Sequence, residues 1–468
     1  MVINPYATLH HYLATAPLTG APSSPARARY SRIAQLLRVL PGETRQVAWS
    51  FLYFFALLCG YYILRPVRDE MAIRAGVDQL QWLFTATFIG TLVCVPLFGL
   101  LVSRLPRRVF LPLVYAAVCA SLMAFFAGFS RTPDSVLLAR CFYVWVSVFN
   151  LFVVSVFWSF MVDIFSPNQS TRLFGLIAAG GTAGAIAGPA LTVSLVGTIG
   201  VSWLLPVSAA LFAFALICIH QLLADTPPRS DDRDRSRRSV AALGGGMLAG
   251  LRMLRDSRYL QGICLLILLY SCASTFLYFT QAHIVAADIA DSEQRTRLFA
   301  LIDLAVNVLT VGAQLFATNR IAERFGLSTT LALIPALLTA GFMLLGIAPV
   351  LAVLVVVQVL RRAGNYAVMK PAREMLFTVL SPAQKYKGKN LVDTLVYRGG
   401  DAVSGWLYAG MRGIGLDTGA IAFAAVPLCG LWMFTGLRLG TKFARLRRNA
   451  HSGAAANPDH YKNKRKQT

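Results

Sequence analysis

The sequence has few acidic residues: Asp and Glu number 21, against 44 Lys and Arg, in a chain of 468 residues. It also lacks the patterns of a disulfide framework or a metal centre. Its eight cysteines form no CxxC pair, and its six histidines stand apart except for His10 and His11. No GxxxxGKS or GxxxxGKT phosphate loop and no nucleophile–base motif is present. These absences argue against an enzyme, and we expect neither a metal nor a cofactor.

Apolar residues make up 56% of the chain and charged residues only 14%, which is too apolar for a soluble protein of this length. Twelve runs are long enough to cross a bilayer as helices, for which about 20 residues are needed. We therefore predict an all-α membrane protein of twelve transmembrane helices in two six-helix halves, surrounded by lipid. The runs lie near residues 46–64, 80–103, 109–129, 136–164, 174–197, 200–222, 259–281, 298–318, 328–348, 350–379, 388–412 and 418–438.

A polar segment, TPPRSDDRDRSRRS, separates the sixth run from the seventh and cannot bury a core of its own. Basic residues gather in this segment, the tails and the even-numbered loops, which predicts cytoplasmic termini. We expect the membrane to be a bacterial inner membrane. The same distribution makes topology, and not nucleic-acid binding, the reason for the net charge of +23. The predicted domains are an N-terminal cytoplasmic tail (1–45), a six-helix half (46–222), a cytoplasmic linker (223–258), a second half (259–439) and a basic cytoplasmic tail (440–468).

The tail before the first run contains the amphipathic stretch YSRIAQLLRVL. Because the first 45 residues contain Arg, Ser and Ala with a single acid, Glu43, a transit peptide is the alternative to a cytoplasmic tail.

The two halves carry related loops: GLLVSRLPRR (Gly99 to Arg108) follows the second run, and NRIAERFGLS (Asn319 to Ser328) follows the eighth. Both resemble the loop signature G-x-x-x-D-R-x-G-R-R of the major facilitator superfamily. Their separation by six spans matches the two six-helix halves of such transporters. We expect gate contacts between helices at Arg104, Arg107, Arg108, Glu323 and Arg324.

The fifth run contains GLIAAGGTAGAIAGPALT, which resembles the superfamily's antiporter signature G-x8-G-x3-G-P-x2-G. Gly175, Gly184, Gly188 and Pro189 are in place, and Thr192 takes the last position. Gly180, Gly184 and Gly188 form a small-residue stripe at four-residue spacing, which lets a neighbouring helix approach closely. Packing alone and packing that serves a conformational switch both explain the stripe.

A closer resemblance lies in two further segments. YYILRPVRDEM, at residues 61–71, is similar to the first-span pattern I-L-R-x-x-K-D of the ATP/ADP translocase family, with Arg68 in place of lysine. KPAREMLFTVLSPAQKYKGKNLVDT resembles that family's P-x-K-E-M followed by K-x-K-G-K-x-x-x-D, with Arg373 in place of lysine. The chain is identified as a divergent member, which implies a facilitator-like fold and exchange of nucleotides across a membrane.

Two regions depart from the pattern of that family. Its nucleotide exchangers carry an acid at the exit of the seventh span, within V-E-V-T-W-K, where this chain has FLYFTQAH. After the fourth span, Asn168 to Thr171 stand where the exchangers have acid and lysine. ATP/ADP exchange is therefore the first hypothesis, and another anionic solute remains open.

Charged residues inside a span cost roughly 2.5–3.5 kcal/mol each, so they mark either function or an ion pair that fixes helix register. Arginine's planar fork suits phosphate and carboxylate. We expect Asp69 and Glu70 to hold the nearby arginines when no anion is bound, and Arg398 to pair with Asp401. The substrate-binding candidates are Arg65, Arg68, Arg361, Arg362, Lys387 and Lys389, and the charge-pair or coupling candidates are Asp69, Asp163, Asp303, Arg373, Glu374, Asp393, Arg398 and Asp401.

The function hypothesis is a secondary active transporter, acting as a monomer, that moves a small anionic solute by alternating access. The alternative is a proton-coupled facilitator for another molecule, with Asp303, Asp163 or Asp401 as the proton carrier. A membrane scaffold or sensor that transports nothing is the third hypothesis, although a scaffold needs no intramembrane charges.

Overall fold

The computed structural model describes residues 39–40, 42–224, 254, 257–316, 318–380 and 392–456, and every regular element within these ranges is a helix. Eleven of the helices are long and apolar enough to cross a membrane. The all-α membrane fold predicted from the sequence is confirmed. The helices before residue 225 are α3 (Thr44–Arg74), η2 (Val77–Gln79), α4 (Leu80–Arg104), α5 (Arg107–Arg131), α6 (Val136–Ile164), α7 (Pro167–Ile199) and α8 (Leu204–Ala224).

The helices after residue 257 continue the bundle and include two short π-helical segments. These helices are α11 (Arg258–Asp288), α12 (Ser292–Phe316), α13 (Thr318–Ile347), α14 (Leu351–Gly364), the π-helix η3 (Asn365–Met369), α15 (Lys370–Leu376), η4 (Phe377–Val379), the π-helix η5 (Val392–Val396), α17 (Tyr397–Gly413) and α18 (Thr418–Ala456).

Each of the twelve predicted runs overlaps a helix, although one is shorter than expected. The run at 388–412 corresponds to η5 and α17, and α17 has only 17 residues. Residues 381–391, which contain Lys387 and Lys389, lie outside the described residues.

The chain forms two compact units. Among the described residues, the first unit contains everything up to Ala224 together with Val285–Val308, and the second contains the other residues of α11 and α12 and all the later helices. The domain boundaries drawn from the sequence stay a prediction. The units differ from them in one segment, because the end of α11 and the first part of α12 belong to the first unit by their contacts.

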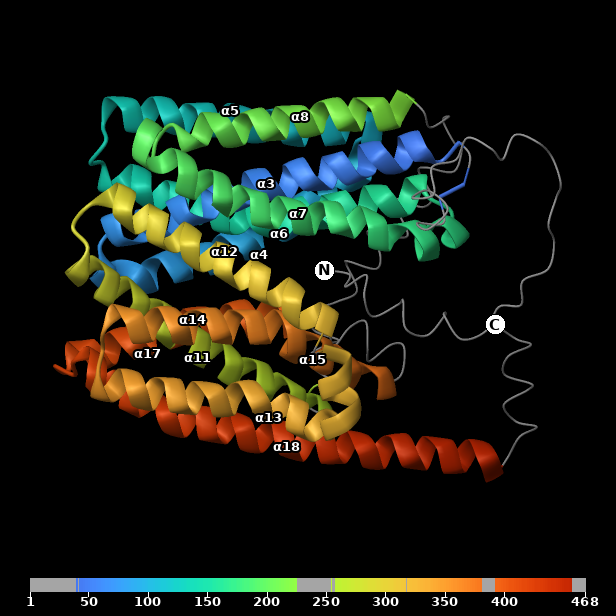
Figure 1. The fold of residues 1–468 in the computed structure, drawn as a ribbon, viewed down its shortest axis with the longest axis vertical. Coiled ribbons are helices and arrows are strands. Elements are labelled where there is room, and N and C mark those ends of the chain that lie inside the picture. The colour runs from blue at the N-terminus through green and yellow to red at the C-terminus, as the bar shows by residue number, and fades with distance from the viewer. Residues whose placement is uncertain are drawn as a thin grey trace. The chain divides into compact units, whose positions relative to one another are not determined.

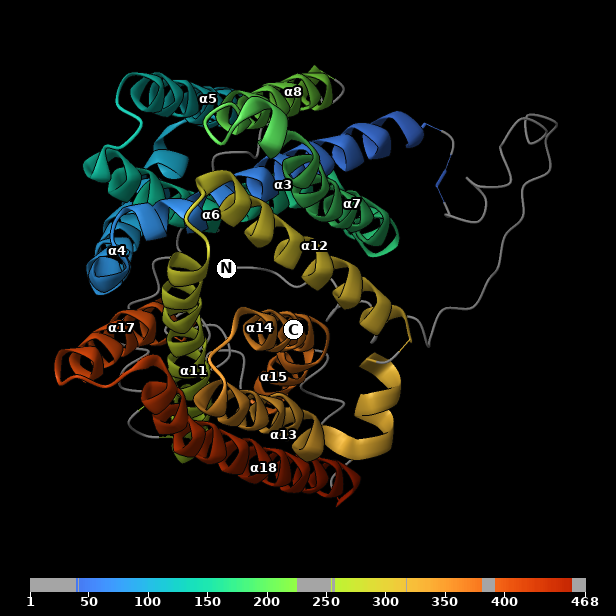
Figure 2. The same ribbon diagram turned by 60° about the vertical axis from the view of Figure 1, so that its left-hand side comes forward.

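In the first unit, α3 and α7 lie side by side (Figure 2). The glycine stripe of α7 is the reason that they approach closely. A Cβ atom added at Gly184 would stand 2.3 Å from the carbonyl oxygen of Phe55, and one added at Gly188 would stand 2.6 Å from that of Cys59. Gly180 meets the carbonyl of Phe51 in the same way, at 2.5 Å. The stripe therefore lies directly against the backbone of α3.

Pro189 opens a gap in the hydrogen bonding of α7, and a side chain from α12 fills it. Proline has no N–H, so the carbonyl of Ala185, four residues earlier, lacks its helical donor. The Nδ2 of Asn307 donates to that carbonyl at 2.6 Å, and both residues are buried. This bond fixes α12 on α7 within the first unit.

In the second unit, α13 and α18 are the helices in most extensive contact, and they run alongside each other (Figure 1). The backbone of α13 turns at Gly326, whose φ of 72° is left-handed and therefore suits glycine.

We predict that Gly184→Ala destabilises the protein by about 1–3 kcal/mol, because the added methyl group would overlap the backbone of α3. Gly197→Ala is the matched control. It lies in the same helix, its Cβ would meet nothing within 4 Å, and alanine is the better helix former by about 1 kcal/mol. Thermal unfolding of the detergent-purified variants measures both. Equal midpoints for the two variants would refute close α3–α7 packing at this glycine.

We predict a coupling between Asn307 and Pro189 in a double-mutant cycle. Asn307→Leu alone leaves the buried Ala185 carbonyl without a donor and costs about 1–3 kcal/mol. In a Pro189→Ala background the restored N–H serves that carbonyl, so the same change should cost at least about 1 kcal/mol less. Additive effects on thermal unfolding would contradict the interpretation.

Candidate functional site

Two clusters of polar side chains lie between packed helices of the described residues, one in each unit. The first cluster is defined by Arg65, Arg68, Asp69 and Glu70 of α3 with Arg295 and Asp303 of α12. It arises because α3 does not end where its apolar run ends at residue 64 but continues to Arg74. The charges of YYILRPVRDEM therefore stand on a helix that is buried among its neighbours, with Glu70 fully buried.

Arg65 and Asp303 form an ion pair in this cluster. The Arg65 Nε stands 3.6 Å from Asp303 Oδ2, and Asp303 is completely buried. At that distance the contact is Coulombic, because a hydrogen bond between nitrogen and oxygen spans about 2.7–3.2 Å. The guanidinium also lies over the ring of Tyr62, 5.7 Å from its centroid.

Glu70 and Arg295 form the tighter ion pair of the first cluster. The Arg295 NH2 group donates to Glu70 Oε1 at 2.9 Å, and its Nε lies 2.8 Å from Oε2, so both carboxylate oxygens are engaged. Arg74 lies 4.0 Å from the same carboxylate and donates to the hydroxyl of Ser292 at 2.9 Å. Arg68 donates to its neighbour Asp69 at 2.7 Å. The arginines of YYILRPVRDEM are therefore each paired with an acid.

The second cluster surrounds Arg361 of α14. Its Nε and NH2 groups both donate to Gln358 Oε1, at 3.0 and 2.8 Å, and its NH1 group donates to Ser274 Oγ at 2.6 Å. Gln358 in turn donates to Gln281 of α11. Arg361, Gln358 and Gln281 are buried. Every described hydrogen-bond partner of this arginine is neutral, in contrast to the arginines of the first cluster.

Asp401 of α17 lies in the second cluster but does not pair with Arg361. It accepts hydrogen bonds from the hydroxyl groups of Ser271 and Thr275. Arg398 lies over the ring of Tyr397, at 5.9 Å. The pairing of Arg398 with Asp401 expected from the sequence does not occur among the ion pairs of the described residues.

Two π-helical segments border the second cluster. η3 begins four residues after Arg361, and η5 ends directly before Tyr397. Tyr397 stacks on Tyr270, with ring centroids 6.0 Å apart. Single-turn π-helices inside longer helices are rare and occur frequently at functional sites. Their position next to a buried arginine marks this region of the second unit as a candidate substrate site.

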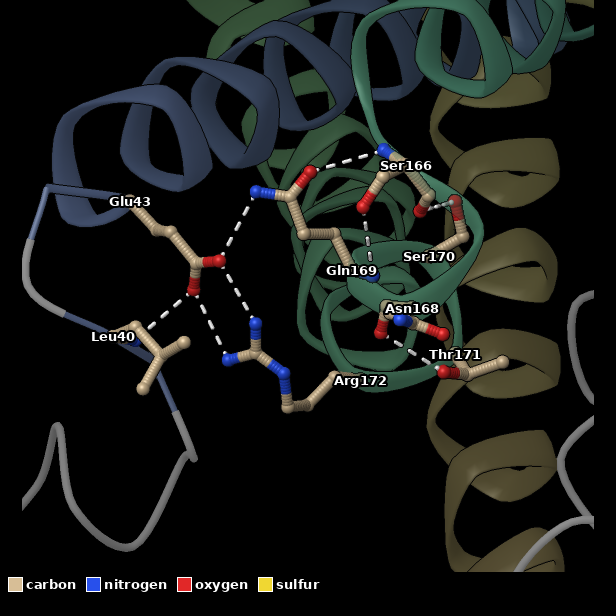
Figure 3. Close-up of polar contacts among 8 residues, drawn as sticks. All are labelled: Leu40, Glu43, Ser166, Asn168, Gln169, Ser170, Thr171 and Arg172. Atoms are coloured by element: carbon tan, nitrogen blue, oxygen red, sulfur yellow. Dashed lines mark hydrogen bonds and ion pairs between the residues drawn. The ribbon is translucent and has the colours of Figure 1, made fainter.

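A third polar arrangement joins Glu43, just before α3, to the start of α7 (Figure 3). Arg172 donates to both carboxylate oxygens of Glu43, at 2.8 and 3.0 Å, and the amide of Gln169 donates at 3.0 Å. Gln169 also forms a capping box with Ser166. The backbone N–H of Leu40 donates to the carboxylate as well. This cluster ties the segment before α3 to the first turn of α7.

The comparison with known protein families agrees with this helical fold. The family model of the Major Facilitator Superfamily matches residues 49–385. The chain belongs to the Major Facilitator Superfamily.

Curated relatives of this facilitator include two proteins named ADP,ATP carrier protein 1. The one from Chlamydia trachomatis serovar D is 22% identical over 475 residues, which cover 86% of this chain and 89% of the relative. The one from Chlamydia muridarum is 21% identical over the same shares. The chain is therefore a divergent member of a transporter family: it is a multi-pass integral membrane protein and a secondary transporter, not an enzyme.

Solved structures show the same fold. An auto-inhibited peptide transporter of the POT family aligns with a TM-score of 0.60 at 15% identity, over 86% of this chain and 97% of that one. The nucleoside transporter NupG aligns with a TM-score of 0.55 at 14% identity, over 87% of this chain and 99% of that one. These similarities concern the facilitator's architecture alone.

The remaining residues singled out from the sequence are spread over the facilitator. Arg104, Arg108 and Arg324 are exposed, Arg362 is buried, and Asp163, Arg373 and Glu374 are half-buried. Arg104 lines an apolar groove between α4 and α6. Arg107, Glu323 and Asp393 lie in helices, but their side chains are outside the described residues.

The residues of the two clusters that escaped the sequence analysis include Arg295, Ser274, Gln281 and Gln358. Arg295 lies in the polar first turn of α12 and gives no signal of its own. Gln358 stands three residues before Arg361, so helical spacing could have placed the two side chains together. Gln281 is a single amide near the end of an apolar run, and its polarity alone could have marked it as a candidate.

We predict that Glu43 makes the thermal stability of the protein fall as the pH drops into the acid range. Burial alone would raise the pKa of this carboxyl, but the hydrogen bonds from Arg172, Leu40 and Gln169 outweigh it and hold the pKa below the ordinary 4.5. The stabilisation is therefore complete above pH 4.5 and is lost as the pH falls through the lowered pKa of the folded state. Glu43→Gln should cost about 1 kcal/mol at neutral pH and reduce the loss of thermal stability below pH 4.5.

The control for this prediction is Asp134→Asn, because Asp134 is exposed between α5 and α6. Unfolding midpoints measured from pH 7 to the most acidic tolerated value should separate the two variants. Identical pH profiles for wild type and Glu43→Gln would contradict the assigned role.

Proposed function

We propose that this transporter exchanges small anionic solutes, with ATP and ADP as the first pair to test. The observation that carries the proposal is Arg361, a buried guanidinium whose described hydrogen bonds all go to neutral groups. A charge held inside a membrane bundle is costly unless it is compensated. An anionic substrate supplies that compensation when it binds, and the planar guanidinium suits phosphate and carboxylate.

The first cluster supports exchange by competition. Arg65 is held by Asp303 at 3.6 Å, a distance at which the charges attract without a formed hydrogen bond. An incoming anion competes with Asp303 for Arg65, and its departure returns the arginine to the aspartate. Ligand binding can shift the equilibrium between two conformations only through such differential contacts.

The choice of ATP and ADP rests on the two carrier proteins that resemble this chain at 21% and 22% identity. It also rests on the match of YYILRPVRDEM to the translocase pattern. The uncharged FLYFTQAH segment leaves other anions in the test panel.

We further propose a bacterial inner membrane as the location, cytoplasmic termini and a monomer. The excess of Arg and Lys in the tails and even-numbered loops supports this orientation.

The experiment is counterflow into liposomes that contain the purified protein. Vesicles are loaded with ADP, and uptake of labelled ATP is measured, followed by the same assay with phosphate and dicarboxylates. We expect Arg361→Gln to lower exchange at least tenfold, because it removes the charge while keeping the side chain polar. The control is Arg447→Gln, since Arg447 is exposed on α18 and should leave exchange unchanged.

The outcomes of counterflow separate the hypotheses. Exchange of an anion that depends on Arg361 supports the proposal. Uptake driven by an imposed pH gradient, with no counter-anion inside, favours the proton-coupled alternative. No movement of any anion under either condition overturns the proposal.

A further inference from the structure

Two buried glutamines form the part of the second cluster that the proposed function does not use. Gln281 of α11 is 4% exposed and Gln358 of α14 is 2% exposed. A buried amide in a membrane bundle needs partners for both its oxygen and its nitrogen. The way in which these partners are arranged determines what the site can bind.

The direction of the hydrogen bonds follows from Arg361. A guanidinium has donors and no acceptor, so the atom of Gln358 that receives two bonds from Arg361, at 3.0 and 2.8 Å, must be its oxygen. The Gln358 amide nitrogen then donates to the oxygen of Gln281. The order from arginine to Gln358 to Gln281 is therefore fixed by chemistry, and the chain of bonds ends at the Nε2 of Gln281.

The last group in this series of hydrogen bonds, the amide nitrogen of Gln281, is a donor. The Nε2 of Gln281 makes no hydrogen bond to another described residue, and the hydroxyl of Ser274, which accepts from Arg361 at 2.6 Å, donates to none of them either. A guanidinium has five N–H donors, and Arg361 uses three of them in these contacts. Hydrogen bonds in series polarise one another, so Arg361 strengthens the N–H donors of Gln281 without lending them a full charge.

We propose that Gln281 determines the substrate specificity of this transporter by donating to an acceptor oxygen or ring nitrogen that lies beside the anionic group bound by Arg361. The inference rests on the proposed function, because it requires an anion at Arg361. The substrate class is an anion with a second, uncharged or weakly charged acceptor close to its charged group. Simple anions without such an acceptor use Arg361 and Ser274 only.

The test turns the last donor of this series of hydrogen bonds into an acceptor and keeps the other bonds of the series. In Gln281→Glu the carboxylate still accepts the bond from Gln358, but the outer donor becomes a negatively charged acceptor. We expect the KM for ATP exchange to rise at least tenfold, with a smaller change in maximal rate. Lowering the pH should restore part of the affinity as the introduced carboxyl protonates. A purely structural role would give no such recovery.

Two further variants keep the test interpretable. Gln281→Met removes the donor without adding charge and should raise the KM for ATP less than Gln281→Glu does, with no dependence on acid pH. Gln261→Glu places the same substitution at an exposed position of the same helix and should leave the KM unchanged. Inorganic phosphate, whose oxygens all belong to the one charged group that Arg361 binds, should lose less affinity than ATP in Gln281→Met. If Gln281→Glu does not fold, Gln281→Met and the comparison with phosphate decide the matter.

The results distinguish the two proposals. If Arg361→Gln abolishes exchange but the Gln281 variants leave the KM for ATP within twofold of wild type, the specificity role is overturned and anion exchange stands. If neither Arg361→Gln nor any Gln281 variant alters exchange, both proposals fall. A tenfold rise in KM that acid pH reverses in Gln281→Glu alone supports the assignment.

Discussion

The burial of charge inside an apolar helical bundle is the constraint on which the rest of this structure depends. Glu70 is completely buried, and a carboxylate in that position is tolerated only with a partner that compensates its charge. Arg295 is that partner, and it comes from a helix more than two hundred residues later in the chain. The pair therefore decides which helices are neighbours: α12 must lie where its arginine reaches the last turns of α3.

The two clusters satisfy the same constraint in different ways, and the difference bears on function. The first balances arginine with carboxylate, so its charge is neutral before any ligand arrives. In the second, the described hydrogen-bond partners of Arg361 are amide and hydroxyl groups, and the carboxylate of Asp401 accepts from two hydroxyl groups instead of from the guanidinium. In the exchange that we propose, both properties serve the cycle: the neutral partners of Arg361 leave its charge open to a substrate anion, and the acid beside Arg65 competes with that anion for its release.

The sequence was sufficient for the fold because apolar length is a local property, and each predicted run overlaps a helix. It was insufficient to predict which charged side chains contact each other. No pattern in α3 indicates that Arg65 meets Asp303, since that contact depends on how α3 and α12 are rotated about their axes. The continuation of α3 to Arg74 was missed because charged residues resemble the end of a span, and burial by other helices removes that signal. No residue pattern in the sequence indicated the π-helices next to Arg361 and Tyr397.

The contacts of α12 connect these observations. This helix is continuous from Ser292 to Phe316, yet its first part packs in one unit and its remainder in the other. Its polar attachments to the first unit include the pairs at Arg295 and Asp303 and the bond from Asn307 to the carbonyl that Pro189 leaves open. Each is a polar contact of defined geometry, and the same part of α12 also buries the apolar side chains of Phe299, Ile302 and Val306. The polar contacts can change partner, whereas close-packed apolar side chains resist displacement. In the exchange mechanism that we propose, an anion that captures Arg65 takes away the partner of Asp303, so the polar contact between α3 and α12 changes when the anion binds.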